Sequence, residues 1–218
     1  MKVKVLKVLM LSVGAILLAA SCSATTKNNG ENKKEKIENM KTDGKKLVVF
    51  FSHTGENYNV GYIEKGNTHV IADMIAEATG ADTFEIKPVK EYPKVYDECI
   101  EVAKREKQAD ARPAIKDDIA IEDYDVILLG YPNWWGEVPM CVYTFIEGHD
   151  WTGKTVIPFI THEGSGMGGT DRKIASACKG AEVAVGKGLA MQGKVAQENR
   201  EQARKSVENW LNNLKISK

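Results

Sequence analysis

The sequence predicts an α/β fold in which helices cover both faces of a parallel β-sheet. Five short apolar runs alternate along the chain with five segments whose apolar residues recur at helical spacing, which is typical of strand–helix–strand units. Several of these runs are continuously apolar, as expected for strands buried on both faces of a sheet. The predicted strands are 47–51, 83–86, 126–129, 156–160 and 183–189.

The first elements are the clearest. Residues 47–51 read Leu-Val-Val-Phe-Phe and predict a buried strand. A helix is expected over 68–79, because its apolar residues lie three or four positions apart and Gly80 is a natural helix stop. The second strand, 83–86, is expected to end before Pro88.

The next helix is expected over 96–108, with Cys99, Ile100 and Ala103 facing inward. It leads into the third strand, 126–129.

Two prolines mark the second half. Pro139 suits the first turn of a helix, where its missing N–H is not needed. Pro158 falls inside a predicted strand, where it removes one donor from the ladder. The elements expected after the third strand are a helix beginning within 138–146, a strand at 156–160, a helix over 170–178, a strand at 183–189 and a helix over 197–214.

The N-terminus has the pattern of an export signal. Three lysines in the first seven residues precede an uncharged run of thirteen residues, 8–20, which is typical of a secretory signal peptide. The run ends in Leu-Ala-Ala-Ser-Cys, which resembles the lipobox of bacterial lipoproteins. We expect residues 1–22 to be a lipoprotein signal peptide and Cys22 to anchor the exported chain to the bacterial membrane or envelope. Ordinary cleavage nearby is the alternative.

Residues 23–46 predict a flexible polar tether, since they contain too few apolar residues to bury. The whole chain is neutral and residues 1–46 hold ten lysines against four acids, so residues 47–218, the predicted domain, carry a net charge of −6. A mildly acidic domain argues against nucleic-acid binding. No apolar run reaches the ~18 residues needed to span a bilayer.

The three cysteines after Cys22 are an odd number, so no complete disulfide framework is expected.

Ligands of parallel sheets bind beyond the carboxyl ends of the strands, and three loops there have unusual compositions. The first is Ser52-His53-Thr54-Gly55, with Asn67-Thr68 opening the next helix. Hydroxyls, a glycine and a helix N-terminus favour a phosphate, and simple helix capping by Asn67 or Thr68 is the alternative. Eleven residues, 56–66, lie between the two pieces. Their Tyr58 and Tyr62 can cover a ligand or pack at its rim.

The second loop places two tryptophans side by side, in Tyr131-Pro132-Asn133-Trp134-Trp135-Gly136. Aromatic walls suit a planar ring system. Because adjacent residues present different faces, we expect one tryptophan to meet the ligand and the other to pack against protein. Trp134 is nearer the strand end and is the expected ligand neighbour.

The third loop, 161–169, is rich in glycine, which lets backbone amides approach a ligand closely. Gly164, Gly166 and Gly169 match GxGxxG. That motif belongs to the first strand of a dinucleotide-binding unit, whereas this is the fourth strand, so dinucleotide binding is disfavoured.

Together, the Tyr-Pro-x-Trp-Trp-Gly and Thr-x-x-Gly-Ser-Gly loops and the first-strand loop resemble the flavodoxin superfamily, over residues 46–214. The resemblance implies a three-layer fold, a five-stranded parallel sheet in the order 2-1-3-4-5, and bound FMN. It resembles the short-chain type. It assigns the FMN phosphate to Ser52, Thr54, Gly55, Asn67 and Thr68, one side of the isoalloxazine to Pro132, Asn133, Trp134, Trp135 and Gly136, and its other side to Thr161, His162, Glu163, Gly164, Ser165 and Gly166.

The function that follows is electron transfer through FMN in the bacterial cell envelope, to a redox partner protein or a small acceptor such as a quinone. A carrier needs no catalytic side chain. An FMN-dependent NAD(P)H:quinone-type reductase is the first alternative, with His162 and Glu163 as candidates for proton delivery. A flavodoxin-shaped binding module without FMN is the second.

Overall fold

The computed structural model describes residues 40–216 and Lys218. The predicted signal peptide with Cys22, and residues 23–39 of the predicted tether, lie outside the described residues. Of the remaining tether residues, Met40 packs against the domain core, Lys41 pairs with Asp125, and the Lys45 amide donates to the Asp125 carboxylate over 3.1 Å. The last part of that segment therefore contacts the domain.

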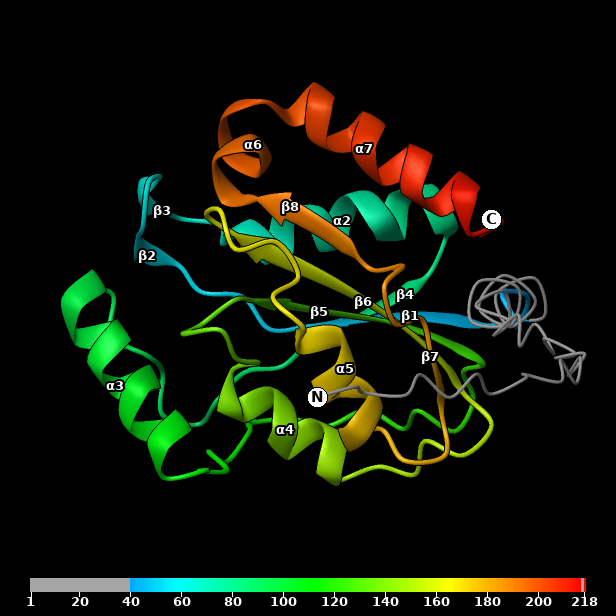
Figure 1. Cartoon of the computed structure of the whole chain (residues 1–218), viewed down its shortest axis with the longest axis horizontal. Helices are drawn as coiled ribbons and strands as arrows, with labels where there is room; N and C mark the ends of the chain where they lie inside the picture. Colours follow the sequence, from blue (N-terminus) through cyan, green and yellow to red (C-terminus); the bar gives the residue numbers. More distant parts are fainter. Residues whose placement is uncertain (1–39, 217) are drawn as a thin grey trace, which may run out of the picture. The chain divides into compact units, whose positions relative to one another are not determined.

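A parallel sheet lies between two layers of helices (Figure 1). Its order is β4-β1-β5-β6-β7, and β8 also pairs with β6. When the strands of this sheet alone are numbered in chain order, they have the expected arrangement 2-1-3-4-5. The short strands β7 and β8 share the fifth position. The strands are β1 (Lys46–Phe50), β4 (Asp82–Glu85), β5 (Val126–Pro132), β6 (Thr155–His162), β7 (Glu182–Val183) and β8 (Leu189–Gln192).

The continuous strand expected over 183–189 is wrong. β7 pairs with the start of β6 and β8 with its end, so Ile157 and Pro158 lie between the two paired stretches. The chain between β7 and β8 turns away at Gly186, whose φ is 75° and whose amide donates to Asp171 over 2.7 Å. Pro158, which cannot donate to a ladder, thus sits opposite the break in the edge strand.

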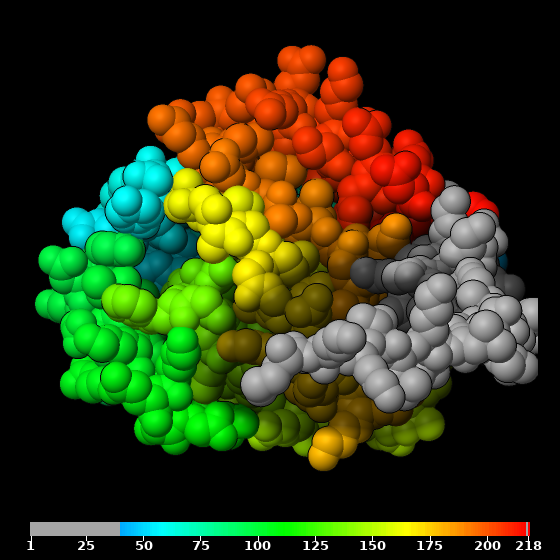
Figure 2. Space-filling model, in the orientation of Figure 1, coloured from blue at the N-terminus to red at the C-terminus, as the bar shows by residue number. Residues whose placement is uncertain are grey.

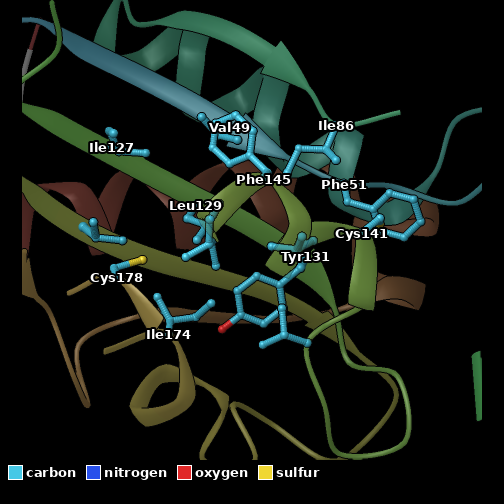
Figure 3. Packing of buried hydrophobic residues seen from close by; sticks show 14 of the residues in the cluster. Val49, Phe51, Ile86, Ile127, Leu129, Tyr131, Cys141, Phe145, Ile174 and Cys178 are labelled. Carbon is cyan, nitrogen blue, oxygen red and sulfur yellow. The ribbon is translucent and has the colours of Figure 1, made fainter. Parts of the chain in front are cut away.

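The alternating side chains of the sheet build two hydrophobic cores. Leu47, Val49 and Phe51 point to one face and join the cluster with α4 and α5, part of which is drawn in Figure 3. Val48 and Phe50 point to the other face and join α2 and α7. The helices are α2 (Asn67–Thr79), α3 (Tyr96–Gln108), α4 (Met140–Glu147), α5 (Thr170–Ala177), α6 (Gly193–Glu198) and α7 (Arg200–Asn213).

Three other expectations need correction. The helix expected over 197–214 is two helices, because Asn199 leaves the helical conformation and its side chain caps α7 through the Gln202 amide. α6 therefore occupies part of residues 190–196, which lie between the strand expected to end at 189 and the helix expected to begin at 197. α4 begins at Met140, one residue after Pro139, which is its N-cap rather than part of its first turn.

The insertion between Gly55 and Gly66 folds as an antiparallel hairpin of β2 (Gly55–Asn57) and β3 (Gly61–Ile63). Sequence reasoning noted the extra residues but predicted no strands there. Cys99, Cys141 and Cys178 are buried and unpaired, in line with the odd cysteine count. No helix in the described part of the chain is long and apolar enough to cross a membrane.

Candidate functional site

The three predicted loops meet around one pocket at the carboxyl ends of β1, β5 and β6. Its volume is about 270 Å³. On the face shown in Figure 2, the hairpin (cyan), α3 (green) and the glycine-rich loop after β6 (yellow) gather around the same region. The pocket is lined by His53, Glu56, Asn57, Tyr58, Asn67, Tyr96, Cys99, Ile100, Ala103, Pro132, Asn133, Trp134, Trp135, Thr161, His162 and Glu163.

One end of the site is the N-terminus of α2. Its N-cap is Gly66, which makes no side-chain capping bond, and the first turn holds no acidic residue. Ser52 Oγ accepts a hydrogen bond from the His69 amide over 3.0 Å, so the loop after β1 lies directly on this helix end. Neither Asn67 nor Thr68 is the N-cap. The amides and the positive end of the helix dipole therefore favour an anion here.

Gly66 explains how the hairpin interrupts this loop without opening it. A Cβ at Gly66 would lie 2.2 Å from Ser52 Oγ and 2.4 Å from the His53 carbonyl oxygen, so the returning chain passes too close for any side chain. Thr68 Oγ1 and Thr161 Oγ1 lie 2.7 Å apart and join the α2 terminus to the loop after β6. The Ser52–His69 bond and the close passage at Gly66 thus bring together the two separated pieces of the predicted phosphate motif, residues 52–55 and 67–68.

Two other predicted phosphate residues are engaged elsewhere. Thr54 Oγ1 accepts from Lys94 Nζ, beside a smaller pocket of about 160 Å³ that is also lined by Lys87 and Lys116. The Asn67 side-chain oxygen accepts from Gln197 Nε2 over 2.9 Å. Sequence reasoning did not find Lys94, because nothing near it indicated that this segment returns to the loop after β1.

The hairpin rests on the N-terminus of α3. The Glu56 carboxylate accepts from the Tyr96 amide over 2.9 Å, and the Glu56 amide donates to the Lys94 carbonyl over 2.8 Å. Tyr58 stacks on Tyr96 with ring centroids 6.1 Å apart. Tyr58 lines the pocket, whereas Tyr62 is 61% exposed and is not part of the lining. One hairpin tyrosine thus belongs to the site.

The tryptophan pair sits on a tight turn with two different environments. Trp134 is half-buried and meets Tyr92, Phe51 and His53 edge-on, with ring centroids 4.8, 5.3 and 5.8 Å apart. Trp135 is 49% exposed at the pocket and its Nε1 donates to the Ile100 carbonyl of α3 over 3.1 Å. Trp134, the expected ligand neighbour, therefore packs against other rings while it lines the pocket, and Trp135 is the more exposed of the two.

Trp135 has a strained backbone. Its φ is 58° and that of Gly136 is 69°, and the amides and carbonyls of Trp134 and Glu137 bond each other over 3.0 and 3.1 Å. Two consecutive positive φ angles are the pattern of a type I′ turn. Glycine adopts this conformation freely, but a bulky residue does so at a cost of about 1–3 kcal/mol, and such outliers cluster at functional sites.

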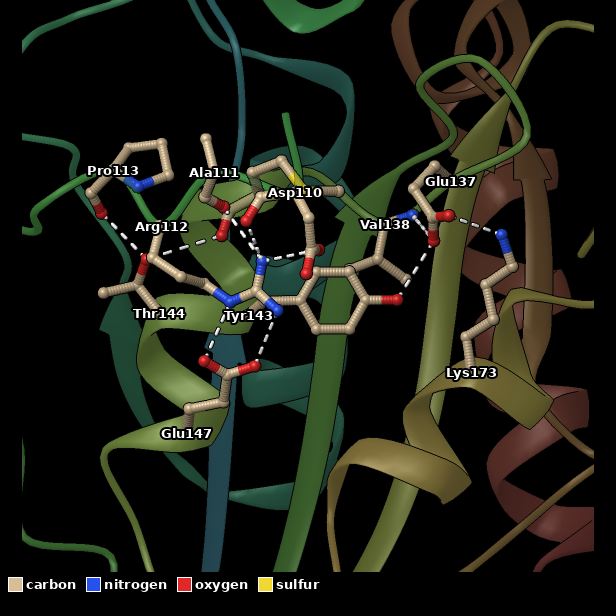
Figure 4. Close-up of polar contacts among 11 residues, drawn as sticks. Asp110, Ala111, Arg112, Pro113, Glu137, Val138, Tyr143, Thr144, Glu147 and Lys173 are labelled. Atoms are coloured by element: carbon tan, nitrogen blue, oxygen red, sulfur yellow. Dashed lines mark hydrogen bonds and ion pairs between the residues drawn. The ribbon is translucent and has the colours of Figure 1, made fainter. Parts of the chain in front are cut away.

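A polar network ties this turn to α4 and α5 (Figure 4). The Glu137 carboxylate accepts from Tyr143 Oη over 3.0 Å and from Lys173 Nζ over 2.5 Å. Burial alone would raise the pKa of Glu137, but hydrogen bonds from Lys173, the Val138 amide and Tyr143 outweigh it, so the pKa lies below its ordinary value. Glu137 is therefore a carboxylate at neutral pH.

Asn133 joins the second and third loops. Its Nδ2 donates to Ser165 Oγ over 2.8 Å, its Oδ1 accepts from the Gly136 amide over 2.9 Å, and its backbone amide donates to the Thr161 carbonyl over 2.8 Å. In the third loop, Gly164, Gly166, Gly168 and Gly169 all have positive φ. The predicted ring-binding loops thus form one connected unit.

The two candidates for proton delivery are both hydrogen-bonded within the protein. His162 Nδ1 accepts from the Gly164 amide over 2.9 Å, and burial lowers the pKa of His162. Glu163 accepts from the Lys194 amide over 3.1 Å at the start of α6. Burial raises the pKa of Glu163, partly offset by that bond.

Sequence reasoning missed the contribution of α3 to the pocket, which comes from Tyr96, Cys99, Ile100 and Ala103. Cys99, Ile100 and Ala103 carried a signal, since helical spacing predicted that they face inward. That spacing does not distinguish a pocket wall from a core. The described residues hold no group of three or more side chains suited to a metal ion.

Comparisons with known proteins agree with this fold. Two Bacteroides flavoproteins of known structure are similar to this chain. That of B. uniformis is 30% identical, with a TM-score of 0.61, covering 78% of this chain and 98% of its own. That of B. eggerthii is 27% identical, with a TM-score of 0.61, covering 80% and 100%.

A Lactobacillus acidophilus flavoprotein determined in complex with FMN shares the fold, at 22% identity and a TM-score of 0.55, covering 70% of this chain and 95% of its own. The curated proteins include no significant match. A family model described as flavodoxin matches residues 45–214, most of the chain. The chain therefore belongs to the flavodoxin family.

Proposed function

We propose that this protein binds FMN and transfers electrons in the bacterial cell envelope. The observation that carries the proposal is one pocket with two ends. The N-terminus of α2, where Asn67 lines the pocket and Ser52 accepts from the His69 amide, lies at one end, and an aromatic wall that includes Tyr58 and Trp135 lies at the other. A ligand with a single phosphate and a planar ring matches both ends. Membership of the flavodoxin family supports FMN as that ligand.

The residues of the site fit the two parts of FMN. The amides at the start of α2 and the Ser52 hydroxyl would hold the phosphate, because they are donors at the positive end of a helix dipole. Trp135 and the loop of 161–166 would hold the isoalloxazine. Asn133 keeps those two loops together, and the hairpin with Tyr58 lines one side of the pocket. When bound, FMN supplies the redox chemistry of one or two electrons.

Ligand selectivity is the direct test of this proposal. Apoprotein should bind FMN at least about tenfold more tightly than FAD or NAD⁺, a difference of about 1.4 kcal/mol, because the site offers one helix N-terminus for one phosphate. Calorimetric titration with each nucleotide measures this, and the visible spectrum of the purified protein reports any flavin that it retains. Tighter binding of FAD or NAD⁺ than of FMN contradicts the proposal.

His162 and Glu163 bear on the alternative, a reductase. A reductase of quinone-type acceptors needs a proton donor beside the flavin. His162 Nδ1 is engaged by the Gly164 amide, and the Glu163 carboxylate is engaged at the N-terminus of α6. These bonds orient both side chains at the pocket, and rapid stoichiometric flavin reduction by NADH or NADPH in stopped-flow would identify a reductase rather than a carrier.

Anchoring in the envelope rests on the N-terminal sequence, which lies outside the described residues. The basic start, the apolar run and the cysteine at 22 motivate it. Cys22→Ala is expected to shift most of the protein out of the membrane fraction, or to leave the precursor uncleaved. Fractionation and mass spectrometry of the processed N-terminus measure this. Unchanged fractionation and processing would overturn the lipid anchor but not the FMN site.

A further inference from the structure

The turn that carries Trp135 needs a restraint, because its backbone is one that bulky residues rarely adopt. Trp135 and Gly136 both have positive φ, and the indole is half-exposed at the pocket. Exposure leaves little packing to keep this side chain in place. On the α3 side, Trp135 Nε1 donates to the Ile100 carbonyl over 3.1 Å, and Lys107 Nζ donates to the Trp135 carbonyl over 2.6 Å.

The other side of the turn is held by one carboxylate. The Glu137 side chain is 15% exposed and bonds Tyr143 of α4 and Lys173 of α5, as Figure 4 shows. Lys173 Nζ also donates to the Gly136 carbonyl over 3.2 Å. The Glu137–Lys173 pair therefore joins the peptide group between Gly136 and Glu137 to two helices of the domain.

We propose that Glu137 and Lys173 are positioning residues for flavin binding, which act by keeping Trp135 in the conformation that meets the isoalloxazine. This inference rests on the proposed function, because it assumes that Trp135 is the neighbour of the ring. Without the ion pair the turn relaxes, and only a fraction of molecules presents Trp135 correctly. The apparent affinity for FMN then falls in proportion to the fraction of molecules that remains competent.

A double-mutant cycle tests whether Glu137 acts through Trp135. Glu137→Gln is expected to weaken FMN binding about three- to tenfold and to leave more residual flavin fluorescence, because the turn is less populated in its competent form. In the Trp135→Ala background the same substitution should change the affinity by less than about twofold. Equal weakening in both backgrounds, or no effect in either, overturns the proposal.

The matched control is Glu147→Gln. Glu147 of α4 forms a two-bond ion pair with Arg112, with Nη2 and Oε1 2.7 Å apart, and it does not touch the turn. The FMN affinity of Glu147→Gln should equal that of the wild type. If Glu137→Gln does not fold, Lys173→Met removes the same ion pair from the other side and enters the same cycle.

A second readout separates this inference from the proposed function. The Trp135 indole N–H gives its own NMR signal in apoprotein, which Trp135→Phe identifies by its loss. Glu137→Gln should shift or broaden that signal, and Glu147→Gln should not. If the wild type fails to bind FMN, the proposed function is wrong and this signal still decides whether Glu137 positions Trp135. An unchanged signal in Glu137→Gln overturns the positioning role.

Discussion

Trp134→Ala is expected to lower the free energy of unfolding of the apoprotein by about 3 kcal/mol, the lower end of the range for such truncations. The indole packs edge-on against Tyr92, Phe51 and His53, and it lies against the core cluster beneath α4. Its removal leaves a cavity that three aromatic rings cannot easily fill. It is half-buried rather than fully enclosed, so a larger loss is not expected.

Urea denaturation of the apoprotein, followed by circular dichroism, measures this change. Trp135→Ala is the matched control, since it removes the same side chain from the next position. A Trp134 variant as stable as the wild type would show that the ring cluster is not part of the folded core. The FMN affinity of Trp134→Ala should change less than that of Trp135→Ala.

Trp135→Ala is expected to weaken FMN binding by at least about tenfold while changing apoprotein stability by less than about 1 kcal/mol. An aromatic stack contributes about 0.5–1.5 kcal/mol beyond the area it buries, and burial of the ring adds to this. The half-exposed indole has few contacts to lose in the apoprotein.

Quenching of flavin fluorescence measures the change in FMN affinity directly, because a stacked indole quenches the ring. If neither tryptophan substitution changes FMN affinity, the pair is structural, and the ring contact belongs to the hairpin that carries Tyr58. Loss of affinity in Trp134→Ala alone would restore the assignment expected from the sequence.

The sequence was most informative where one physical signal dominates. The apolar runs of β1, β5 and β6 identify buried strands, and the chemistry of the three loops that follow them identifies the site. All three loops do converge on one pocket. Strand ends in a parallel sheet share an edge, so composition alone was sufficient to bring them together.

Prediction failed where tertiary contacts decide the outcome. The strand expected over 183–189 is divided where the Gly186 amide bonds Asp171 of α5. No local pattern reports that Trp134 rather than Trp135 packs against Tyr92. Lys94 reaches Thr54 only because the segment before α3 passes beside the loop after β1.

The β2–β3 hairpin gives this chain a point at which residues can be added or removed without moving the sheet. Gly55 pairs directly with Ile63, so the chain leaves and re-enters at nearly the same place, about 5 Å apart as in any antiparallel pair. Residues added to or removed from the tip at Tyr58–Val60 leave the register at Gly55 and Gly66 unchanged. A change of length at the tip would therefore alter what covers this side of the pocket and leave Ser52 and the start of α2 in place.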